Sequence, residues 1–292
     1  MTMTWLYTII NGLLLGGLYT LYGLGLALTF GIMRTVNLAH GDMIVLASFL
    51  SLVLTRLLGL SPFMSLVVLI PAMFVLGQML QRTVLNRTLS EGVMPSIIIT
   101  FGLSIIAQNA MNLIFSADRV SLQQGGLETM SLPITSDFAI GVLPLINLVT
   151  AVAILALLHV FFRRTMVGRA FRATSDDPAT VELMGVNSRR MYALAMGMAF
   201  AVIAVSGVFM GIRTNFSPFD GPGRLIFAFE VVIIGGMGSL YGVLAGGIIL
   251  GIAQTVGGTL NPAWFQLAGH LATLAVLAFR PSGLFPETID RS

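Results

Sequence analysis

Three polar side chains able to hold a proton, an ion or a solute lie within the six residues 37–42. Asn37, His40 and Asp42 stand between two strongly apolar segments. Polar groups at membrane depth are costly, and they usually line a path or a packed interface. We interpret Asp42 as the N-cap of the helix that follows, because Asp is a favoured N-cap residue. For Asn37 and His40, two interpretations stay open: lining a path, or local packing in which Asn37 caps a helix end and His40 bonds to a backbone carbonyl.

A single carboxylate, Glu230, interrupts the apolar run 227–234. A lone ionisable residue in such a run is a functional-site hypothesis by default, and for Glu230 both packing within the bundle and lining of a path stay open. If a short helix covers 229–235, Glu230 lies in its first turn, where the helix dipole stabilises negative charge. Arg213 and Arg224 bracket the preceding loop, and each is a candidate partner for Glu230 or for an acidic partner surface.

Glycines follow this carboxylate at Gly235, Gly236 and Gly238. They fall near the middle of an apolar stretch, 225–257, whose 33 residues are fewer than the roughly 40 that two full crossings need. We predict two short helices around a glycine break. Such a break is tolerated at membrane depth only where protein or a water-filled cavity surrounds it. The three glycines therefore join Asn37, His40, Asp42 and Glu230 as candidate lining of a translocation path.

The arginine-rich segment 163–190 contains the pattern of a short capped helix. Asp177 suits the N-cap, Pro178 the first helical position and Gly185 the helix end. Two turns, about 10 Å long, are too short to be stable alone. The apolar residues of this helix point away from the bilayer, which favours docking to a partner over a solvated loop helix. The predicted docking element consists of Asp177, Pro178, Val181, Glu182, Leu183, Met184 and Gly185.

Enzyme machinery is missing from the sequence. Cysteine is absent, and no zinc-protease or serine-hydrolase motif and no clustered carboxylate pair is present. All 15 basic residues are arginine, so the chain lacks the lysine of a phosphate-binding P-loop. His159 and His270 are isolated, and we expect each to be packed or hydrogen-bonded rather than a metal ligand. We therefore expect no enzymatic activity, bound metal or cofactor.

The composition is that of an integral membrane protein. Of 292 residues, 56% are hydrophobic and only 9% charged, and the mean hydropathy is +0.94. The net charge of +3 does not indicate a nucleic-acid surface. We predict an all-α polytopic bundle of about eight transmembrane helices, forming one domain over 1–292. The candidate spans are 5–33, 42–58, 62–81, 96–115, 139–162, 191–212, the broken stretch 225–257, and 262–279.

Arginine placement predicts the orientation, because cytoplasmic loops are enriched in positive charge. The loop 163–190 carries six arginines and is assigned to the cytoplasm. Counting spans outward, residues 82–95 and the tail after Arg280 are also inside, and 116–138 is outside. The assignment places eleven arginines inside (34, 82, 87, 163, 164, 169, 172, 189, 190, 280 and 291) and four outside (56, 119, 213 and 224). The N-terminus is then periplasmic and the C-terminus cytoplasmic.

Four pairs of glycines recur at a spacing of four residues, which places both members on one helix face and allows close backbone approach. We interpret most of them as helix-packing sites in a compact bundle. The pairs are Gly12/Gly16, Gly207/Gly211, Gly242/Gly246 and Gly247/Gly251.

Several segments together resemble the branched-chain amino-acid ABC-importer permeases, in particular the shorter, H-type subunit of the high-affinity Liv-type system. Their order and spacing cover nearly the whole chain. The segments are 36–41 (VNLAHG), similar to the family's N-F-A-H-G; 168–173 (GRAFRA), 177–178 (DP) and 183–187 (LMGVN), similar to its cytoplasmic coupling loop; and 235–242 (GGMGSLYG) and 280–285 (RPSGLF), similar to its closing segments.

The resemblance implies a bacterial inner-membrane subunit of a binding-protein-dependent importer. Such a subunit pairs with a sister permease and two cytoplasmic ABC ATPases, which bind ATP and Mg²⁺, while a periplasmic solute-binding protein delivers the substrate. Residues 175–186 would be the coupling helix that sits in an ATPase groove. Relatives carry branched-chain or other amino acids, urea, short amides, nucleosides or sugars.

A second class of function stays open: a secondary transporter or channel driven by an ion gradient. Glu230, Asp42 and His40 would then be candidate proton or ion groups. Such a carrier has no need for a capped apolar helix at 178–184, so that helix distinguishes the two classes. A purely structural scaffold is disfavoured by the ordered glycine breaks.

Overall fold

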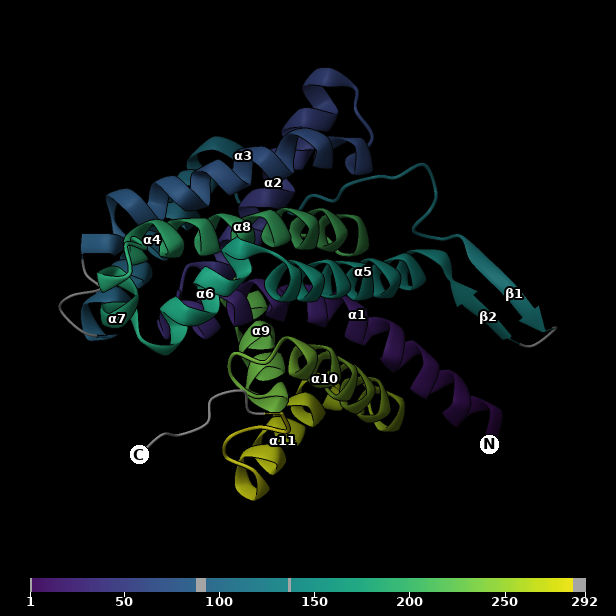
Figure 1. Ribbon diagram of the computed structural model, residues 1–292. Coiled ribbons are helices and arrows are strands. Elements are labelled where there is room, and N and C mark those ends of the chain that lie inside the picture. The colour runs from purple at the N-terminus through teal and green to yellow at the C-terminus, as the bar shows by residue number, and fades with distance from the viewer. Residues whose placement is uncertain (1, 88–92, 136–137, 286–292) are drawn as a thin grey trace.

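The computed structural model describes residues 2–87, 93–135 and 138–285, and these residues form a helix bundle with one small hairpin (Figure 1). The predicted all-α polytopic bundle is confirmed. The helices are α1 (Thr2–Met33), α2 (His40–Leu58), α3 (Pro62–Thr83), the 3-10 turn η1 (Leu85–Arg87), α4 (Val93–Phe115), α5 (Val142–Arg164), α6 (Met166–Asp176), α7 (Pro178–Leu183), α8 (Ser188–Arg213), α9 (Gly221–Gly235), α10 (Leu240–Leu260) and α11 (Trp264–Phe279).

Within the described residues, seven helices are long and apolar enough to cross a membrane: α1, α2, α3, α4, α5, α8 and α10. The predicted span 262–279 is the shorter α11, of 16 residues. The predicted break in 225–257 is present, but the prediction of two short helices around it is wrong for the second. α10 has 21 residues and can cross, because it continues three residues beyond the predicted stretch, whereas α9 has only 15.

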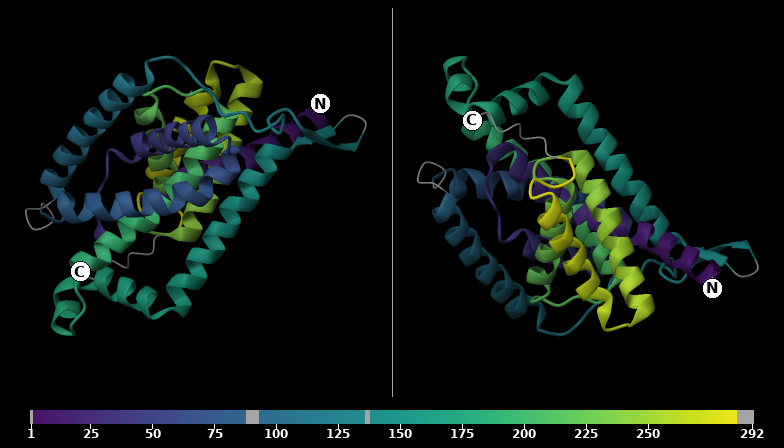
Figure 2. Two further views of the ribbon diagram at one scale, coloured as in Figure 1. Left: turned by 90° about the horizontal axis from the view of Figure 1, so that it is seen from above. Right: turned by 90° about the horizontal axis from the view of Figure 1, so that it is seen from below.

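The longest helix, α1, passes through the centre of the bundle. Figures 1 and 2 show it between the layer of α5 and α8 on one side and α9 and α10 on the other. α1 and α8 are the most buried spans, whereas α3, α4 and α5 expose most of their side chains. A membrane helix with a buried surface on all sides is surrounded by protein, so α1 is the core of the fold and α3, α4 and α5 offer their outer faces to lipid or to partners.

The glycine pairs explain how α10 reaches α1. A Cβ atom added to Gly16 would lie 2.6 Å from the Cα atom of Ile248, and one added to Gly251 would lie 2.3 Å from the carbonyl oxygen of Gly12. Gly247 makes the same kind of approach to Gly16. Two predicted pairs, one on each helix, therefore face each other across a backbone contact that no side chain would fit.

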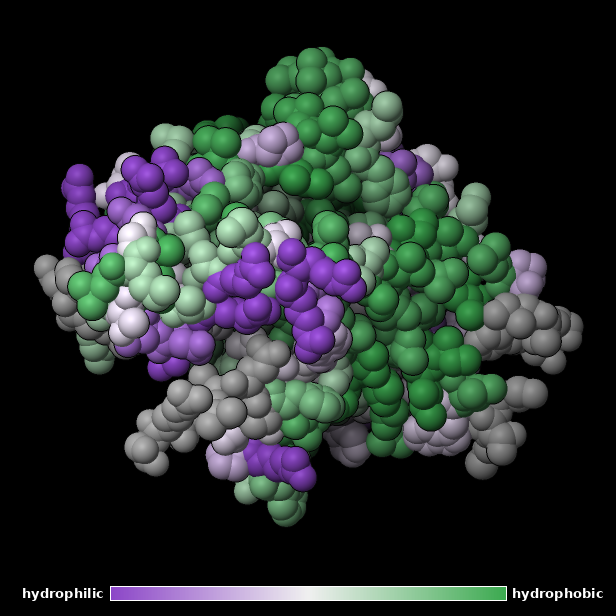
Figure 3. Space-filling view, viewed as in Figure 1, coloured by the Kyte–Doolittle hydropathy of each residue, from purple (hydrophilic) through white to green (hydrophobic). Residues whose placement is uncertain are grey.

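The two ends of the bundle differ in charge. At one end, Arg34 Nη2 donates to the carbonyl oxygen of Ser175 at 3.5 Å, and Asn86 Nδ2 donates to that of Arg189 at 3.3 Å. Ten arginines belong to this end: 34, 82, 87, 163, 164, 169, 172, 189, 190 and 280. Figure 3 shows hydrophilic residues gathered over the part of this end that carries α6 and α7. Arg291 lies outside the described residues.

Arg56, Arg119 and Arg213 lie at the opposite end together with the N-terminal end of α1, and Arg224 lies in the first turn of α9. The loops at the opposite end are tied together by a backbone bridge between Val120 and Phe216 and by an ion pair of 3.6 Å between Arg119 and Asp220. A short antiparallel hairpin, β1 (Ser131–Thr135) and β2 (Phe138–Gly141), leads directly into α5 and was not predicted. The arginine segregation that the sequence predicts is thus present in the fold.

Candidate functional site

The second helix begins inside the bundle. His40 Nε2 lies 2.9 Å from the carbonyl oxygen of Tyr22, in the middle of α1, so the non-helical residues 34–39 turn back from the end of α1. Asn37 Oδ1 accepts a hydrogen bond from the backbone N–H of Ala39, the N-cap of α2, at 3.0 Å. These are the contacts that the local-packing interpretation predicts, and whether Asn37 and His40 also line a path stays a prediction.

Asp42 lies inside the first turn of α2, so the prediction that it is the N-cap is wrong. The helix begins two residues earlier because the Asn37 side chain organises the preceding turn. The buried Asp42 carboxylate instead accepts a hydrogen bond of 2.9 Å from Nε2 of Gln108 on α4. It also packs against the start of α9, where a Cβ atom on Gly221 would lie 1.9 Å from its Oδ1 atom. Asp42 thus joins α2, α4 and α9 at one buried point.

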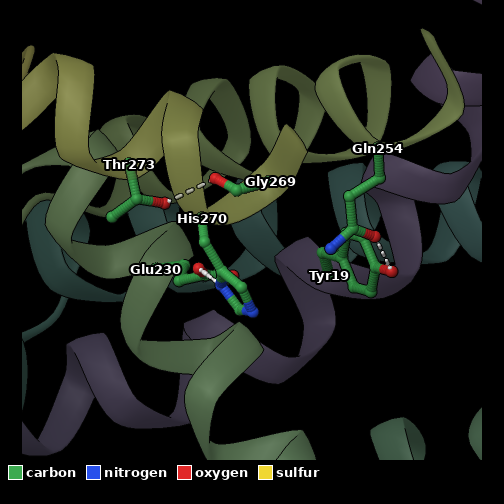
Figure 4. A network of polar contacts seen from close by, with 6 residues as sticks. All are labelled: Tyr19, Glu230, Gln254, Gly269, His270 and Thr273. Carbon is green, nitrogen blue, oxygen red and sulfur yellow. Dashed lines mark hydrogen bonds and ion pairs between the residues drawn. The ribbon is translucent and has the colours of Figure 1, made fainter. Parts of the chain in front are cut away.

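Glu230 forms the second polar junction. α9 begins at Gly221, so Glu230 lies in the third turn, and the prediction that it sits near a helix N-terminus is wrong. Its Oε1 atom is hydrogen-bonded to Nδ1 of His270 on α11, as Figure 4 shows. Neither Arg213 nor Arg224, the partners considered from sequence, is ion-paired with it. The side chain of Glu230 is buried, that of His270 is 43% exposed, and Oε2 of Glu230 has no partner among the described residues.

Two further polar side chains lie beside this junction. The hydroxyl of Tyr19 on α1 donates to Oε1 of Gln254 on α10, and Figure 4 shows this pair close to Glu230 and His270. Tyr19, Gln108 and Gln254 were not predicted as site residues. A signal was available for the two glutamines, because each interrupts an apolar span in the same way as Glu230.

The glycine break is a place of backbone contact. A Cβ atom on Gly235 would lie 2.2 Å from the carbonyl oxygen of Gly242, and the reverse substitution meets Gly235 at the same distance. Gly236 and Gly238 have φ values of 105° and 91°, which L-residues rarely adopt. The turn from α9 to α10 therefore requires glycine for conformation as well as for space. Its predicted place in a translocation path stays a prediction.

The predicted docking helix is present as α7. The Asp177 carboxylate accepts the backbone N–H groups of Ala179 and Thr180 at 3.0 and 3.1 Å. The hydrogen bond from the Thr180 hydroxyl, and after it these backbone hydrogen bonds, lower the pKa of Asp177. At the other end, Gly185 has φ of 86°, and the N–H of Val186 bonds to the carbonyl of Val181. This is the pattern of a Schellman C-cap.

Only part of the apolar surface of α7 points outward. Leu183 and Met184 are 90% and 79% exposed, whereas Val181 is buried. The prediction that all three point outward is wrong for Val181, which lies on the opposite side of α7 from Leu183, two residues away. Val181 anchors α7, and Leu183 and Met184 form the tip of the bundle at the arginine-rich end.

The tip is connected to the core. The Ser175 hydroxyl donates to the carbonyl of Gly31, in the last turn of α1, at 2.6 Å, and the Ser188 hydroxyl donates to that of Pro178 at 3.2 Å. The first bond ties α6, which precedes α7, to the end of α1, and the second ties the first residue of α7 directly to the first residue of α8. The remaining members of the predicted set occupy their predicted positions, with Pro178 at the first helical position and Glu182 exposed.

A family model described as "Branched-chain amino acid transport system / permease component" matches residues 8–277. The chain belongs to this permease family. The matched region contains every residue of both candidate sets, the docking helix and the path, so both lie in the part of the permease that the family model covers. No solved structure matches the chain.

Curated relatives agree with this assignment. The permease is 29% identical to the high-affinity branched-chain amino acid transport system permease protein LivH of Escherichia coli, over 94% of this chain and 93% of LivH. It is 27% identical to BraD of Pseudomonas aeruginosa, over 96% and 95% of the two chains. LivM of E. coli, a second permease protein of a high-affinity branched-chain system, is 28% identical over 43% of this chain and 30% of LivM. The near-complete coverage of LivH and BraD supports the shorter, H-type assignment.

Proposed function

We propose that this permease imports branched-chain or chemically related amino acids as one membrane subunit of an ATP-driven, binding-protein-dependent importer. LivH and BraD are both named for branched-chain amino acid transport and match this chain over nearly its full length. The observation that carries the ATP-driven part of the proposal is α7, a doubly capped helix with Leu183 and Met184 exposed at its tip.

The proposed partners follow from what this chain lacks and what its relatives have. LivM supports a sister permease as the neighbour in the membrane. Two ABC ATPases would bind ATP and Mg²⁺, since this chain has no lysine for a P-loop and is proposed to bind no cofactor. A periplasmic binding protein would deliver the solute to the opposite face.

The proposed orientation places α6 and α7 in the cytoplasm. Ten described arginines lie at that end, three lie at the other, and Arg224 lies at the start of α9, which agrees with the positive-inside rule. The N-terminus is then periplasmic and the C-terminus cytoplasmic in a bacterial inner membrane. Residues 175–186 would be pushed by the ATPases, and the bonds from Ser175 and Pro178 would pass the movement to α1 and α8.

The proposed path runs past the buried polar junctions. Its candidate lining is Asn37, His40, Asp42, Glu230, Gly235, Gly236 and Gly238. Broken helices that begin at membrane depth are a recurrent way to present polar groups to a solute. α9 is such a helix, since its first residue packs on the buried Asp42.

The test is to tag the chain, extract it from native membranes in mild detergent, and identify the co-purified proteins by mass spectrometry. The proposal predicts a second permease and P-loop ATPases. Recovery of the chain alone, still able to move solute into ATP-free liposomes, would contradict it and favour a secondary transporter that uses Glu230, Asp42 and His40.

A further inference from the structure

Two arginines, one at the end of α8 and the other at the start of α9, have side-chain nitrogen atoms without partners. Arg213 is the last residue of α8, and Arg224 lies in the first turn of α9. Nη1 of Arg213 and Nε of Arg224 are buried, and neither has a hydrogen-bond partner among the described residues. A buried N–H of a charged group that stays unpaired is costly, so these donors call for an acceptor.

The nearby carboxylates do not supply that acceptor, because each is bonded elsewhere. Asp220 pairs with Arg119 at 3.6 Å and accepts the backbone N–H of Ser217 at 2.9 Å. Asp42 accepts from Gln108, and Glu230 is bonded to His270. Glu128, which lines a depression together with Arg213, is bonded to the backbone N–H of Gln124. Within the described residues, neither Arg213 nor Arg224 forms an ion pair, so their unpaired donors are not taken up by a carboxylate of the chain.

Both guanidinium groups face the bundle interior. Seven residues before Arg213, on the same face of α8, the Ser206 hydroxyl donates to the carbonyl oxygen of Leu21 in the central helix α1 at 2.8 Å. One turn after Arg224, Phe227 packs against the Tyr19 ring with the centroids 5.2 Å apart. The two arginines therefore converge from α8 and α9 on the same stretch of α1.

Arg213 and Arg224 differ in their position relative to the helix dipoles. A cation in the last turn of α8, such as Arg213, is favourable, but a cation in the first turn of α9 adds to the positive end of that dipole. The combination of a helix N-terminus and unpaired guanidinium donors is suited to an anion.

A depression in the surface lies next to Arg213. It has a volume of about 400 Å³ and is lined by Arg213 together with polar residues of the two neighbouring loops, among them Ser121, Gln123, Thr214 and Asn215. Arg213 supplies the positive charge of this lining, and Glu128 supplies the negative charge.

We propose that Arg213 and Arg224 bind the carboxylate group of the amino acid as it enters the permease. The inference rests on the proposed function, which supplies an amino acid at this face. A guanidinium fork matches a carboxylate with two parallel hydrogen bonds, and the unpaired nitrogens then gain acceptors. All amino acids have this carboxylate group, so the site recognises amino acids as a class. Selection among their side chains takes place at another site.

The test uses the purified importer complex in nanodiscs without its binding protein, and saturation-transfer NMR with L-leucine or L-leucinamide, which lacks the carboxylate. The expected result is that L-leucine binds at least about tenfold more tightly than L-leucinamide, and that Arg213→Gln and Arg224→Gln each remove about tenfold of the affinity for L-leucine. The control Arg56→Gln, at the same end of the bundle as Arg213, should leave both affinities unchanged.

Equal binding of the two probes, or full L-leucine affinity in both glutamine variants, would overturn the site. Retained L-leucine affinity combined with loss of binding-protein docking would also overturn it, and would assign the arginines to acidic side chains of that protein. Arg213→Lys keeps the positive charge but loses the planar guanidinium group, and it should bind L-leucine with an intermediate affinity. This variant keeps the site testable if a glutamine variant fails to fold. Uptake by the wild type is measured separately, so a failure of the proposed function shows as absent ATP-dependent uptake, independently of the comparison between probes.

Discussion

Glu230 on α9 and His270 on α11 are hydrogen-bonded to each other although they lie 40 residues apart in the chain. The two helices that they join are short, with 15 and 16 residues. The carboxylate is buried while the imidazole is partly exposed, so the pair reaches from the interior to the bundle surface. A polar pair at such a place is expected to face protein or water rather than lipid.

If this pair lines the path, Glu230→Gln should lower the initial rate of solute uptake by about tenfold, because the amide cannot present a charge to the solute or to His270. Uptake is measured in proteoliposomes containing equal amounts of assembled complex. The matched control is Tyr241→Phe, which removes the histidine bond between α5 and α10 at His159. An unchanged rate and affinity in Glu230→Gln would make the pair purely structural.

Leu183→Asp should uncouple ATP hydrolysis from uptake and leave the protein folded. Leu183 is 90% exposed, so its replacement should change the free energy of unfolding by less than about 0.5 kcal/mol while placing a charge on the docking tip. Met166→Asp, at a residue that is also exposed at this end, is the control and should retain uptake. Normal ATP-driven uptake by Leu183→Asp would remove α7 from the coupling mechanism.

Gly185→Pro should have the same functional effect for a different reason. The φ of 86° at Gly185 is inaccessible to proline, so the C-cap of α7 is lost. The measurement is uptake together with limited proteolysis of the 175–187 segment, which should become faster. A variant that is cleaved faster but imports normally would show that an ordered α7 is dispensable.

The cap at Asp177 predicts a pH profile. Its hydrogen bonds hold the pKa of the folded carboxyl below its ordinary 3.8, so the cap is fully formed above that ordinary value and is lost as the pH falls through the lower folded value. Amide exchange in α7, corrected for intrinsic rates, should therefore not vary between about pH 5 and 8. Asp177→Ala should accelerate it about fivefold at Ala179 and Thr180, whereas Asp177→Asn should keep the cap. Equal exchange in all three proteins would contradict the capping role.

Gly16→Leu should destabilise the bundle strongly, by about 3 kcal/mol or more, because the side chain would collide with the backbone of α10. Gly102→Leu, on α4, is the control, since a Cβ atom there meets nothing within 4 Å. Thermal unfolding in detergent should show a clear loss for the first variant and little change or a gain for the second. Similar melting temperatures would mean that α1 and α10 are not in backbone contact.

The parts of the fold that could be predicted from sequence are those that local patterns determine. Hydropathy alone located the spans, and Asp177, Pro178 and Gly185 were enough to bound α7, because caps are short-range interactions. The glycine spacing indicated close helix packing, but not that Gly12 and Gly16 meet Gly247 and Gly251, since partner choice depends on the whole bundle.

The errors arose where distant segments override local preference. Asp42 fits an N-cap when only its neighbours in sequence are considered, but its carboxylate accepts a hydrogen bond from Gln108, 66 residues away. Glu230 was placed in a first turn because the start of α9 at Gly221, stabilised by packing on Asp42, is invisible in the hydropathy profile. The inward-facing nitrogens of Arg213 and Arg224 could not be foreseen either, because arginines next to apolar spans usually read as topology signals.

The most direct measurement is uptake of radiolabelled L-leucine into proteoliposomes that contain the co-purified complex and its binding protein. With ATP and Mg²⁺ supplied to the side that carries α7, and without any ion gradient, the account predicts uptake that stops when ATP is omitted and that Leu183→Asp abolishes. Uptake that proceeds without ATP under a proton or sodium gradient, and that is unaffected by Leu183→Asp, would contradict the importer assignment.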